Sequence, residues 1–163
     1  MLRLSKLTDY AVVVLIRLAE ADPGTIDAVQ TSPGIAAATG VPEPTVAKVL
    51  KALASGDLVT SQRGARGGYR LARGLGAISV ADVITAIDGP IALTACVDGA
   101  TGACDVQRLC AVKGRWDLVN FAIRESLHAI SLADMRNASV PAAFRVPDAA
   151  RTQAPTPHAF PAE

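Results

Sequence analysis

The sequence predicts a mainly α-helical fold that contains one two-stranded β-hairpin, and three observations support this prediction. Apolar residues recur at the three- and four-residue spacing of helices along most of residues 5–136. A glycine-rich turn at 64–68 separates two short segments of strand-forming residues. Half of the 163 residues are hydrophobic but only 4% are aromatic, so an aliphatic core is available and disorder of the whole chain is excluded.

The first two helices are predicted before and after a loop that begins at 21–24. The first helix has Ser5 or Thr8 as its cap, and its apolar stripe consists of Leu7, Ala11, Val14, Leu15 and Leu18. The second helix is short. We expect it to start at Ser32, whose hydroxyl precedes Pro33, and to end at Gly40.

The third predicted helix follows a tight turn at 40–41, because Pro42 and Pro44 are tolerated only in a helix cap or first turn. It ends at Gly56. The residues predicted to be buried are Val46, Val49, Leu50 and Leu53, and those predicted on the opposite face are Thr45, Lys48 and Lys51.

Two short strands, 58–60 and 69–71, are predicted on either side of the glycine turn. Ser79 then caps a short helix, which ends at 88–90 and buries Val80, Val83, Ile84 and Ile87.

Residues 91–114 show no period and are predicted to form a loop, whereas 115–136 are predicted to form one long helix. One apolar face of this helix consists of residues 119, 123, 127 and 130. A partial second face consists of residues 118, 122 and 132. Two such faces indicate packing on its own domain and on a second subunit, with burial inside a monomer as the alternative. The tail from 138 is predicted to be disordered, and we identify no internal repeat.

Positive charge is concentrated in the first half of the chain, although the net charge is only +1. Residues 45–73 include one acid, Asp57, and six basic residues, which are Lys48, Lys51, Arg63, Arg66, Arg70 and Arg73. Residues 74–137 hold five basic and seven acidic residues. This asymmetry indicates a polyanion-binding surface in the first half, with an ordinary solvated face as the alternative.

Two short helices joined by a tight turn and followed by a basic hairpin are the element order of a winged helix-turn-helix domain. The DNA major groove, about 12 Å wide, admits one helix whose first residues reach the base edges. The residues expected at base edges are Glu43, Thr45 and Lys48, and those expected near phosphates are Arg63, Arg66 and Arg70. Lys51 is also expected to bind DNA. Arg66, at the hairpin tip, is also placed to enter the minor groove. The alternative is a helix pair that only packs, with the hairpin as a surface ribbon.

Three cysteines, Cys96, Cys104 and Cys110, lie in the glycine-containing loop with C-x7-C-x5-C spacing. Thiolates are the preferred ligands of iron–sulfur clusters, and an irregular loop can surround such a group. The alternatives are buried free cysteines and a structural zinc site, although the chain has no CxxC pair.

Four separated motifs resemble the family of bacterial winged-helix regulators typified by IscR and NsrR. They are the opening 4–11, the hairpin 63–71, the three cysteines and the ending 130–135, and the last is similar to the branch that regulates SUF-system iron–sulfur assembly. The resemblance covers 1–137. It implies a homodimer that carries an iron–sulfur cluster, either 2Fe-2S or 4Fe-4S, binds a palindromic operator and represses iron–sulfur cluster assembly genes. The corresponding domains are 1–77 for DNA binding, 78–137 for the cysteine loop and dimerisation helix, and 138–163 for the tail.

The resemblance leaves the fourth cluster ligand open. Relatives of the IscR type have a histidine shortly after the last cysteine, where this chain has Lys113, and their first two cysteines are closer together. The NsrR-like branch uses an aspartate on the first helix of the partner subunit, and Asp9 matches it. The alternative role for Asp9 is to complement the helix dipole. Weaker candidates are Asp98, Asp105, His128 and His158.

No catalytic constellation or phosphate-binding loop is found in the sequence, so we do not expect an enzyme. Two other functions remain open: a nitric-oxide-responsive repressor with the same ligands, and a small iron–sulfur redox protein without a DNA role. The basic segment 48–73 favours a DNA-binding function. An apolar run of only seven residues, 10–16, the lack of a secretory signal and three cysteines together predict a cytoplasmic protein.

Overall fold

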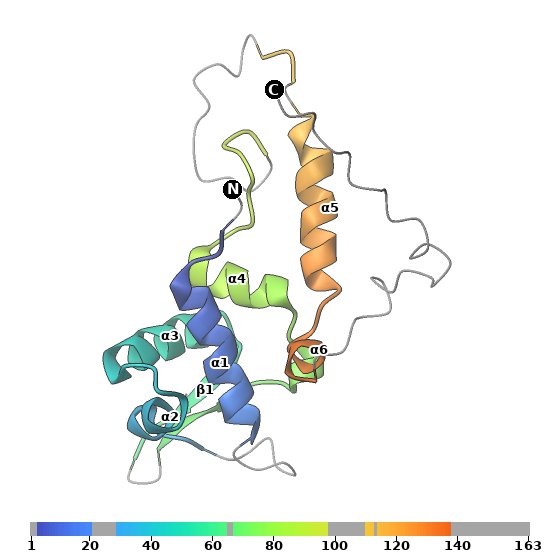
Figure 1. Cartoon of the computed structure of the whole chain (residues 1–163). Coiled ribbons are helices and arrows are strands. Elements are labelled where there is room, and N and C mark those ends of the chain that lie inside the picture. The colour runs from blue at the N-terminus through green and yellow to red at the C-terminus, as the bar shows by residue number, and fades with distance from the viewer. Residues whose placement is uncertain (1–2, 21–28, 65–66, 98–109, 113, 138–163) are drawn as a thin grey trace, which may run out of the picture.

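The computed structural model describes residues 3–20, 29–64, 67–97, 110–112 and 114–137. The elements in these residues are α1 (Lys6–Glu20), α2 (Ser32–Thr39), α3 (Glu43–Ser55), β1 (Val59–Gln62), β2 (Gly68–Leu71), the 3-10 turn η1 (Leu75–Ala77), α4 (Val80–Asp88), α5 (Trp116–His128) and α6 (Leu132–Arg136). In Figure 1, α4 runs crosswise between α1 and α5, and α6 lies at the foot of α5. The mainly helical fold with one antiparallel hairpin is confirmed.

The start of α1 is joined to the end of α4. Ser5 Oγ accepts a hydrogen bond from the Thr8 backbone N–H at 3.2 Å, which confirms Ser5 as the cap. The Thr8 side chain is buried, and its hydroxyl donates to a carboxylate oxygen of Asp88 at 2.6 Å. A single threonine therefore closes the first turn of α1 and attaches it to α4.

The cap of the second helix lies one residue before the position that the sequence predicts. Thr31, rather than Ser32, is the cap, and its hydroxyl accepts from the Gly34 N–H at 3.3 Å. The reason is that the Ile35 N–H already donates to the Thr31 carbonyl, so Ser32 lies inside the first turn. The helix ends as predicted, because Gly40 adopts the left-handed conformation with φ of 73°.

The hairpin is longer than predicted and pairs Val59 with Leu71 at one end and Gln62 with Gly68 at the other. It also gains a partner outside the two strands. Gln30 and Tyr69 exchange both backbone hydrogen bonds, at 2.8 and 2.9 Å, so the segment before α2 lies along β2. The middle of β2 is thereby fixed to the segment that leads into the helix-turn-helix.

The predicted helix 115–136 is wrong as a single element, because α5 ends at His128 and α6 starts at Leu132. Ser131 has extended backbone angles and caps α6 by accepting from the Asp134 N–H, and Asp134 accepts in turn from the Ser131 N–H. This capping box is more favourable than continuing the α5 turn through Ser131.

The start of α4 carries the same device, in which Ser79 and Asp82 form the capping box. The two segments are Ile-Ser-Val-Ala-Asp at 78–82 and Ile-Ser-Leu-Ala-Asp at 130–134, a short internal repeat that the sequence analysis missed. They pair antiparallel: the Val80 N–H donates to the Ile130 carbonyl and the Leu132 N–H to the Ile78 carbonyl, both at 2.9 Å. We call this pairing of 78–82 with 130–134 the clasp.

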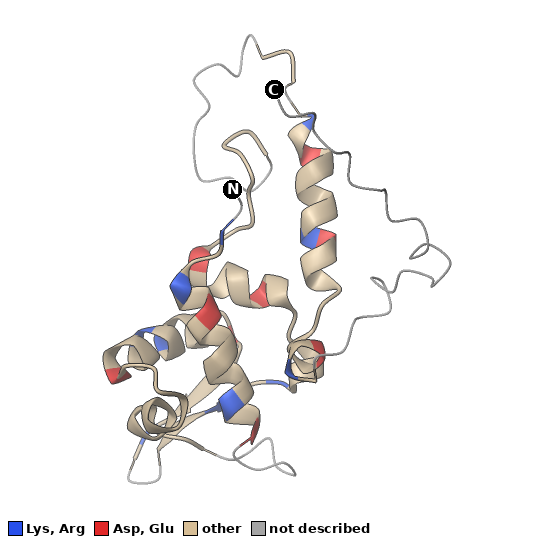
Figure 2. Cartoon of the chain, in the orientation of Figure 1, with Lys and Arg blue, Asp and Glu red and all other residues tan. Residues whose placement is uncertain are grey.

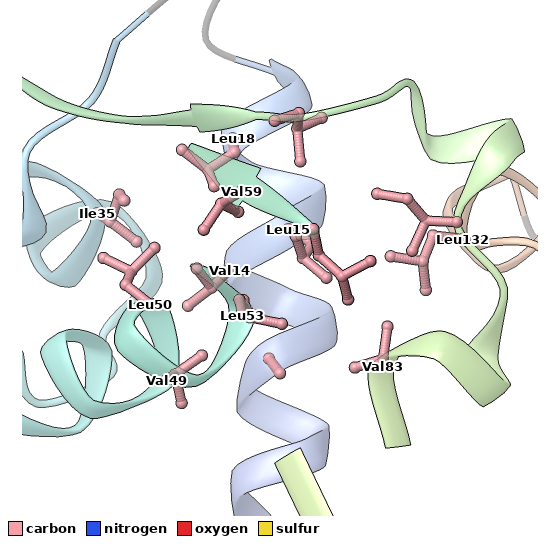
Figure 3. Close-up of a cluster of buried hydrophobic side chains, with 14 of the residues drawn as sticks. Val14, Leu15, Leu18, Ile35, Val49, Leu50, Leu53, Val59, Val83 and Leu132 are labelled. Carbon is pink, nitrogen blue, oxygen red and sulfur yellow. The ribbon is translucent and has the colours of Figure 1, made fainter. Parts of the chain in front are cut away.

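The hydrophobic core lies among α1, α2, α3, the hairpin, α4 and α6 (Figure 3). Leu132 of α6 is fully buried in it, whereas Asn120 is the one buried residue of α5. The apolar side chains Leu118 and Phe121 of α5 are 75% and 61% exposed. The C-terminal part of the chain is therefore anchored in the core through α6 rather than along α5. No helix among the described residues has the length and apolar character needed to cross a membrane.

Replacing Leu132 with Ala is expected to destabilise the folded chain by about 2–5 kcal/mol, because it opens a cavity where α6 enters the core. Urea unfolding followed by circular dichroism measures this difference. Met135→Ala on the same helix is the matched control, since Met135 is 46% exposed and its loss is expected to cost less than about 0.5 kcal/mol. Equal effects of the two substitutions would contradict this anchoring role.

Candidate nucleic-acid interface and cysteine loop

The third helix exposes the face that the sequence predicts to meet DNA. Val46, Val49, Leu50 and Leu53 are buried against the core, whereas Glu43, Lys48 and Lys51 are exposed and Thr45 is half-exposed. Glu43 and Thr45 lie in the first turn, directly after the 40–42 turn from α2. Figure 2 shows basic residues on α3 and along the hairpin.

The hairpin residues predicted near phosphates differ in their surroundings. Arg63 is exposed at the end of β1. Arg70 is half-buried, and its Nε donates to the Thr60 hydroxyl on the paired strand at 3.1 Å, which fixes its guanidinium against the sheet. Arg66 lies outside the described residues. The structure thus places Arg63 and Arg70 on one wing, with Arg63 the more accessible.

Two glycines of the wing are required by close backbone approach. A Cβ on Gly67 would collide with the Gln62 carbonyl oxygen across the turn. A Cβ on Gly68 would lie 2.5 Å from the carbonyl oxygen of Gln30, the residue that pairs with Tyr69. The glycine run therefore lets three backbone segments meet where the strands enter the hairpin turn.

Arg73 belongs to the basic segment of the sequence but not to this surface. Its Nη2 donates to a carboxylate oxygen of Asp82 at 3.1 Å. Burial raises the pKa of Asp82, but the hydrogen bonds from Ser79 and the charge of Arg73 outweigh it and hold the pKa below its usual value. Arg73 therefore connects the end of the hairpin to α4.

The cysteine loop is fixed to α5 at its start by one buried amide. Asn120 is 4% exposed; its Nδ2 donates to the Ile91 carbonyl at 3.1 Å and its Oδ1 accepts from the Leu93 N–H at 3.0 Å. The sequence analysis overlooked Asn120. A signal was present, because this amide interrupts a run of apolar residues from 118 to 123.

The cysteines are described in part. Cys96 and Cys110 are free and half-buried, and Cys96 Sγ lies 3.2 Å from the Thr94 hydroxyl. Cys104, Asp98, Asp105, Lys113 and His158 lie outside the described residues. Asp9 is exposed on the first turn of α1, and His128 is exposed at the end of α5. Among the described residues, no three His, Cys, Asp or Glu side chains come close enough together to hold a metal ion.

The helix-turn-helix with its exposed third helix and attached two-stranded wing defines a winged-helix DNA-binding protein. The sequence model of one family, Rrf2, described as an iron-dependent transcriptional regulator, matches residues 4–138. This chain belongs to the Rrf2 family of transcriptional regulators, and it is a regulator rather than an enzyme.

Curated relatives agree with this membership. An HTH-type transcriptional regulator of Mycobacterium tuberculosis is 35% identical over 143 residues, which are 86% of this chain and 84% of the relative. A second, from Azotobacter vinelandii, is 33% identical over 135 residues, or 82% and 79% of the two chains.

Solved structures agree as well. IscR of T. potens is 28% identical with a TM-score of 0.59, over 92% of this chain and 96% of that one. CymR, the global cysteine regulator of B. subtilis, is 25% identical with a TM-score of 0.63, over 86% and 100%.

Gly68→Ala is expected to lower the free energy of unfolding by about 1–3 kcal/mol and to weaken DNA binding, because the added methyl group separates the wing from Gln30. Thermal unfolding and a gel shift on the chain's own promoter region measure the two effects. Gly74→Ala is the control, since no atom lies within 4 Å of a Cβ at that position. Normal stability and normal DNA affinity of Gly68→Ala would show that the close contact with Gln30 does not require glycine at this position.

Proposed function

We propose that this chain is a cytoplasmic homodimer that represses iron–sulfur cluster assembly genes, with its DNA affinity set by a bound iron–sulfur cluster. The observation that carries the proposal is the position of α3. Its inner face is locked into the core while its first turn and basic outer face remain exposed beside the wing. That is the arrangement needed to place a helix in the major groove and the wing on the flanking backbone.

Each DNA-binding residue has a specific role in this proposal. Thr45 and Glu43, in the first turn of α3, contact base edges together with Lys48. Lys51 and the wing arginines Arg63, Arg66 and Arg70 contact phosphates, and their glycine-rich turn approaches the duplex closely. Residues 1–77 supply this surface, and residues 78–137 supply the cysteine loop and the contact between subunits.

The proposal assigns α5 to dimer formation. Leu118 and Phe121 lie three residues apart and therefore on one side of the helix, and both are largely exposed. Val119 and Trp116 are also exposed at its N-terminal half. Exposed apolar side chains gathered on one helix favour a second copy of α5 as their partner, because a symmetric dimer buries the same patch twice.

The donor set fits an iron–sulfur cluster. The half-buried thiols of Cys96 and Cys110 are soft ligands held in an irregular loop, and Cys104 lies between them in sequence. Asp9 is exposed and, among the described residues, belongs to no group of metal-binding side chains, which leaves it available to the partner subunit. A bound cluster would supply an iron- and redox-sensitive connection between the loop of one subunit and α1 of the other.

Two observations support iron–sulfur cluster assembly genes as the regulated genes. The family model carries the description iron-dependent, and the ending Ile130–Met135 is similar to that of the SUF-system branch. Regulation by the cluster that these genes produce would form a feedback loop.

Substitutions on α3 and on the wing are expected to affect DNA binding differently. Thr45→Ala or Lys48→Ala should cost about 1–3 kcal/mol at the operator and relax the sequence preference, because each removes a base contact. Arg63→Ala should weaken binding to all sequences and lower the slope of log K against log salt by about 1, because it removes a phosphate contact. Fluorescence anisotropy at several salt concentrations measures both quantities, and Arg66→Ala is expected to behave like Arg63→Ala.

Arg136→Ala is the matched control, because Arg136 is equally exposed but lies on α6. It should leave operator affinity and salt slope unchanged. The interface assignment fails if Arg63→Ala also leaves both unchanged, or if Arg136→Ala reproduces its effect.

Cysteine and Asp9 substitutions test the cluster ligands. Protein purified without oxygen is expected to show visible absorption that is lost in Cys96→Ser and Cys110→Ser. Asp9→Ala should keep the dimer but shift the spectrum or speed cluster loss, because one iron exchanges its carboxylate ligand for water or a small thiol. Glu20→Ala, which removes an exposed carboxylate at the other end of α1, is the control.

Mixed dimers test whether Asp9 acts on the partner subunit. In a heterodimer of Asp9→Ala and Cys96→Ala chains, ligation between subunits leaves one intact site, whereas ligation within a chain leaves none. One normal cluster per dimer is the expected result. A colourless anaerobic protein containing zinc and no iron would refute the cluster, and a normal Asp9→Ala spectrum would restrict Asp9 to its helix-dipole role.

A further inference from the structure

A polar pocket of about 510 Å³ lies between the DNA-binding core and α5. Its floor is rigid, because the end of α3 packs on α4 so tightly that a Cβ on Gly56 would lie 2.7 Å from Ala86 Cβ. Its walls carry Arg73, which follows the hairpin, and Arg124 and His128 of α5. Three nitrogen-rich side chains from two separate parts of the chain therefore line one cavity.

The pocket keeps a net positive charge. Two guanidinium groups face one carboxylate, that of Asp82, and the carboxyl end of α3 adds only about half a negative charge. Arg73 donates a hydrogen bond to Asp82 through Nη2. Its Nε is buried and has no hydrogen-bond partner in the described part of the chain. Because a buried N–H without a partner is unfavourable, this arginine retains donor capacity that an anion would satisfy.

The imidazole is held in place beside these arginines. His128 Nδ1 lies 3.3 Å from the Ser79 hydroxyl, the same hydroxyl that caps α4. This contact orients the ring and leaves Nε2 for a ligand. Thr85 of α4 adds an exposed hydroxyl to the lining.

The pocket is remote from the proposed DNA contacts. It lies at Ser55 and Gly56, beyond the carboxyl end of α3, whereas Glu43 and Thr45 lie at the other end of a helix about 20 Å long. An anion in the pocket is therefore a separate ligand and not an operator phosphate.

We propose that this pocket binds a small molecule through an oxyanion group, a phosphate or a carboxylate, held by Arg73, Arg124 and His128. Guanidinium groups bind both oxyanions with paired, charge-assisted hydrogen bonds. Because Arg73 belongs to the DNA-binding core and Arg124 to α5, the ligand joins the two and favours one position of α5. The proposal depends on neither the cluster nor the operator.

Isothermal titration calorimetry of the full-length chain tests this site, with inorganic phosphate in one arm and citrate in the other at constant ionic strength. We expect one saturable site per chain for at least one of the two anions. Arg124→Gln and, separately, His128→Gln should weaken its Kd about tenfold, the usual effect of losing one charge-assisted hydrogen bond. The same anion should raise the melting temperature of the wild type more than that of either variant.

Arg115→Gln is the matched control, because Arg115 is an exposed arginine at the opposite end of α5, outside the pocket. Its Kd should stay within about twofold of the wild type. The anion that binds more tightly shows whether the oxyanion group of the ligand is a phosphate or a carboxylate. Three results would overturn the proposal: no saturable binding of either anion up to about 10 mM, an unchanged Kd in both pocket variants, or an equal loss in Arg115→Gln. Since all three substituted side chains are exposed, circular dichroism is expected to show intact folds.

Discussion

Two backbone hydrogen bonds of the clasp, between Val80 and Ile130 and between Leu132 and Ile78, connect the C-terminal part of the chain to the DNA-binding core. They hold α6 beside the core that buries Leu132, and the described residues between α4 and α6 add only Val97 and Asn120 as buried side chains. The capping boxes at Ser79 and Ser131 fix the directions in which α4 and α6 leave this point. The positions of α5 and of the pocket lined by Arg73 and Arg124 depend on it.

The helix α5 is attached to the rest of the chain in two different ways. Its far end meets the start of the cysteine loop through Asn120, and its near end runs into the clasp beside His128. Between them the helix contacts α4 with only partly buried side chains, among them Ile123 and Leu127. The contact between α5 and α4 is therefore less buried than the contact that α6 makes with the core through Leu132.

The sequence was sufficient for the parts of the fold that depend on local chemistry. Apolar spacing located α1 and α3, Gly40 and Gly56 located helix ends, and the glycine run located the wing. It failed at Ser131, where the capping box with Asp134 and the nonlocal pairing with Ser79 together end the helix that apolar spacing predicts to continue. Within the candidate site, charge and spacing identified the outer face of α3. They did not identify Asn120 or the pairing of Arg73 with Asp82, because a polar side chain shows its partner only in the folded chain.

The clasp also closes a loop of roughly fifty residues that contains every cysteine of the chain. The entropy of closing such a loop grows only with the logarithm of its length, so doubling it would cost about 0.6 kcal/mol. Insertions and deletions between the cysteines are therefore nearly neutral for the stability of the DNA-binding core. The spacing of the cysteines can therefore change while the DNA-binding core stays the same.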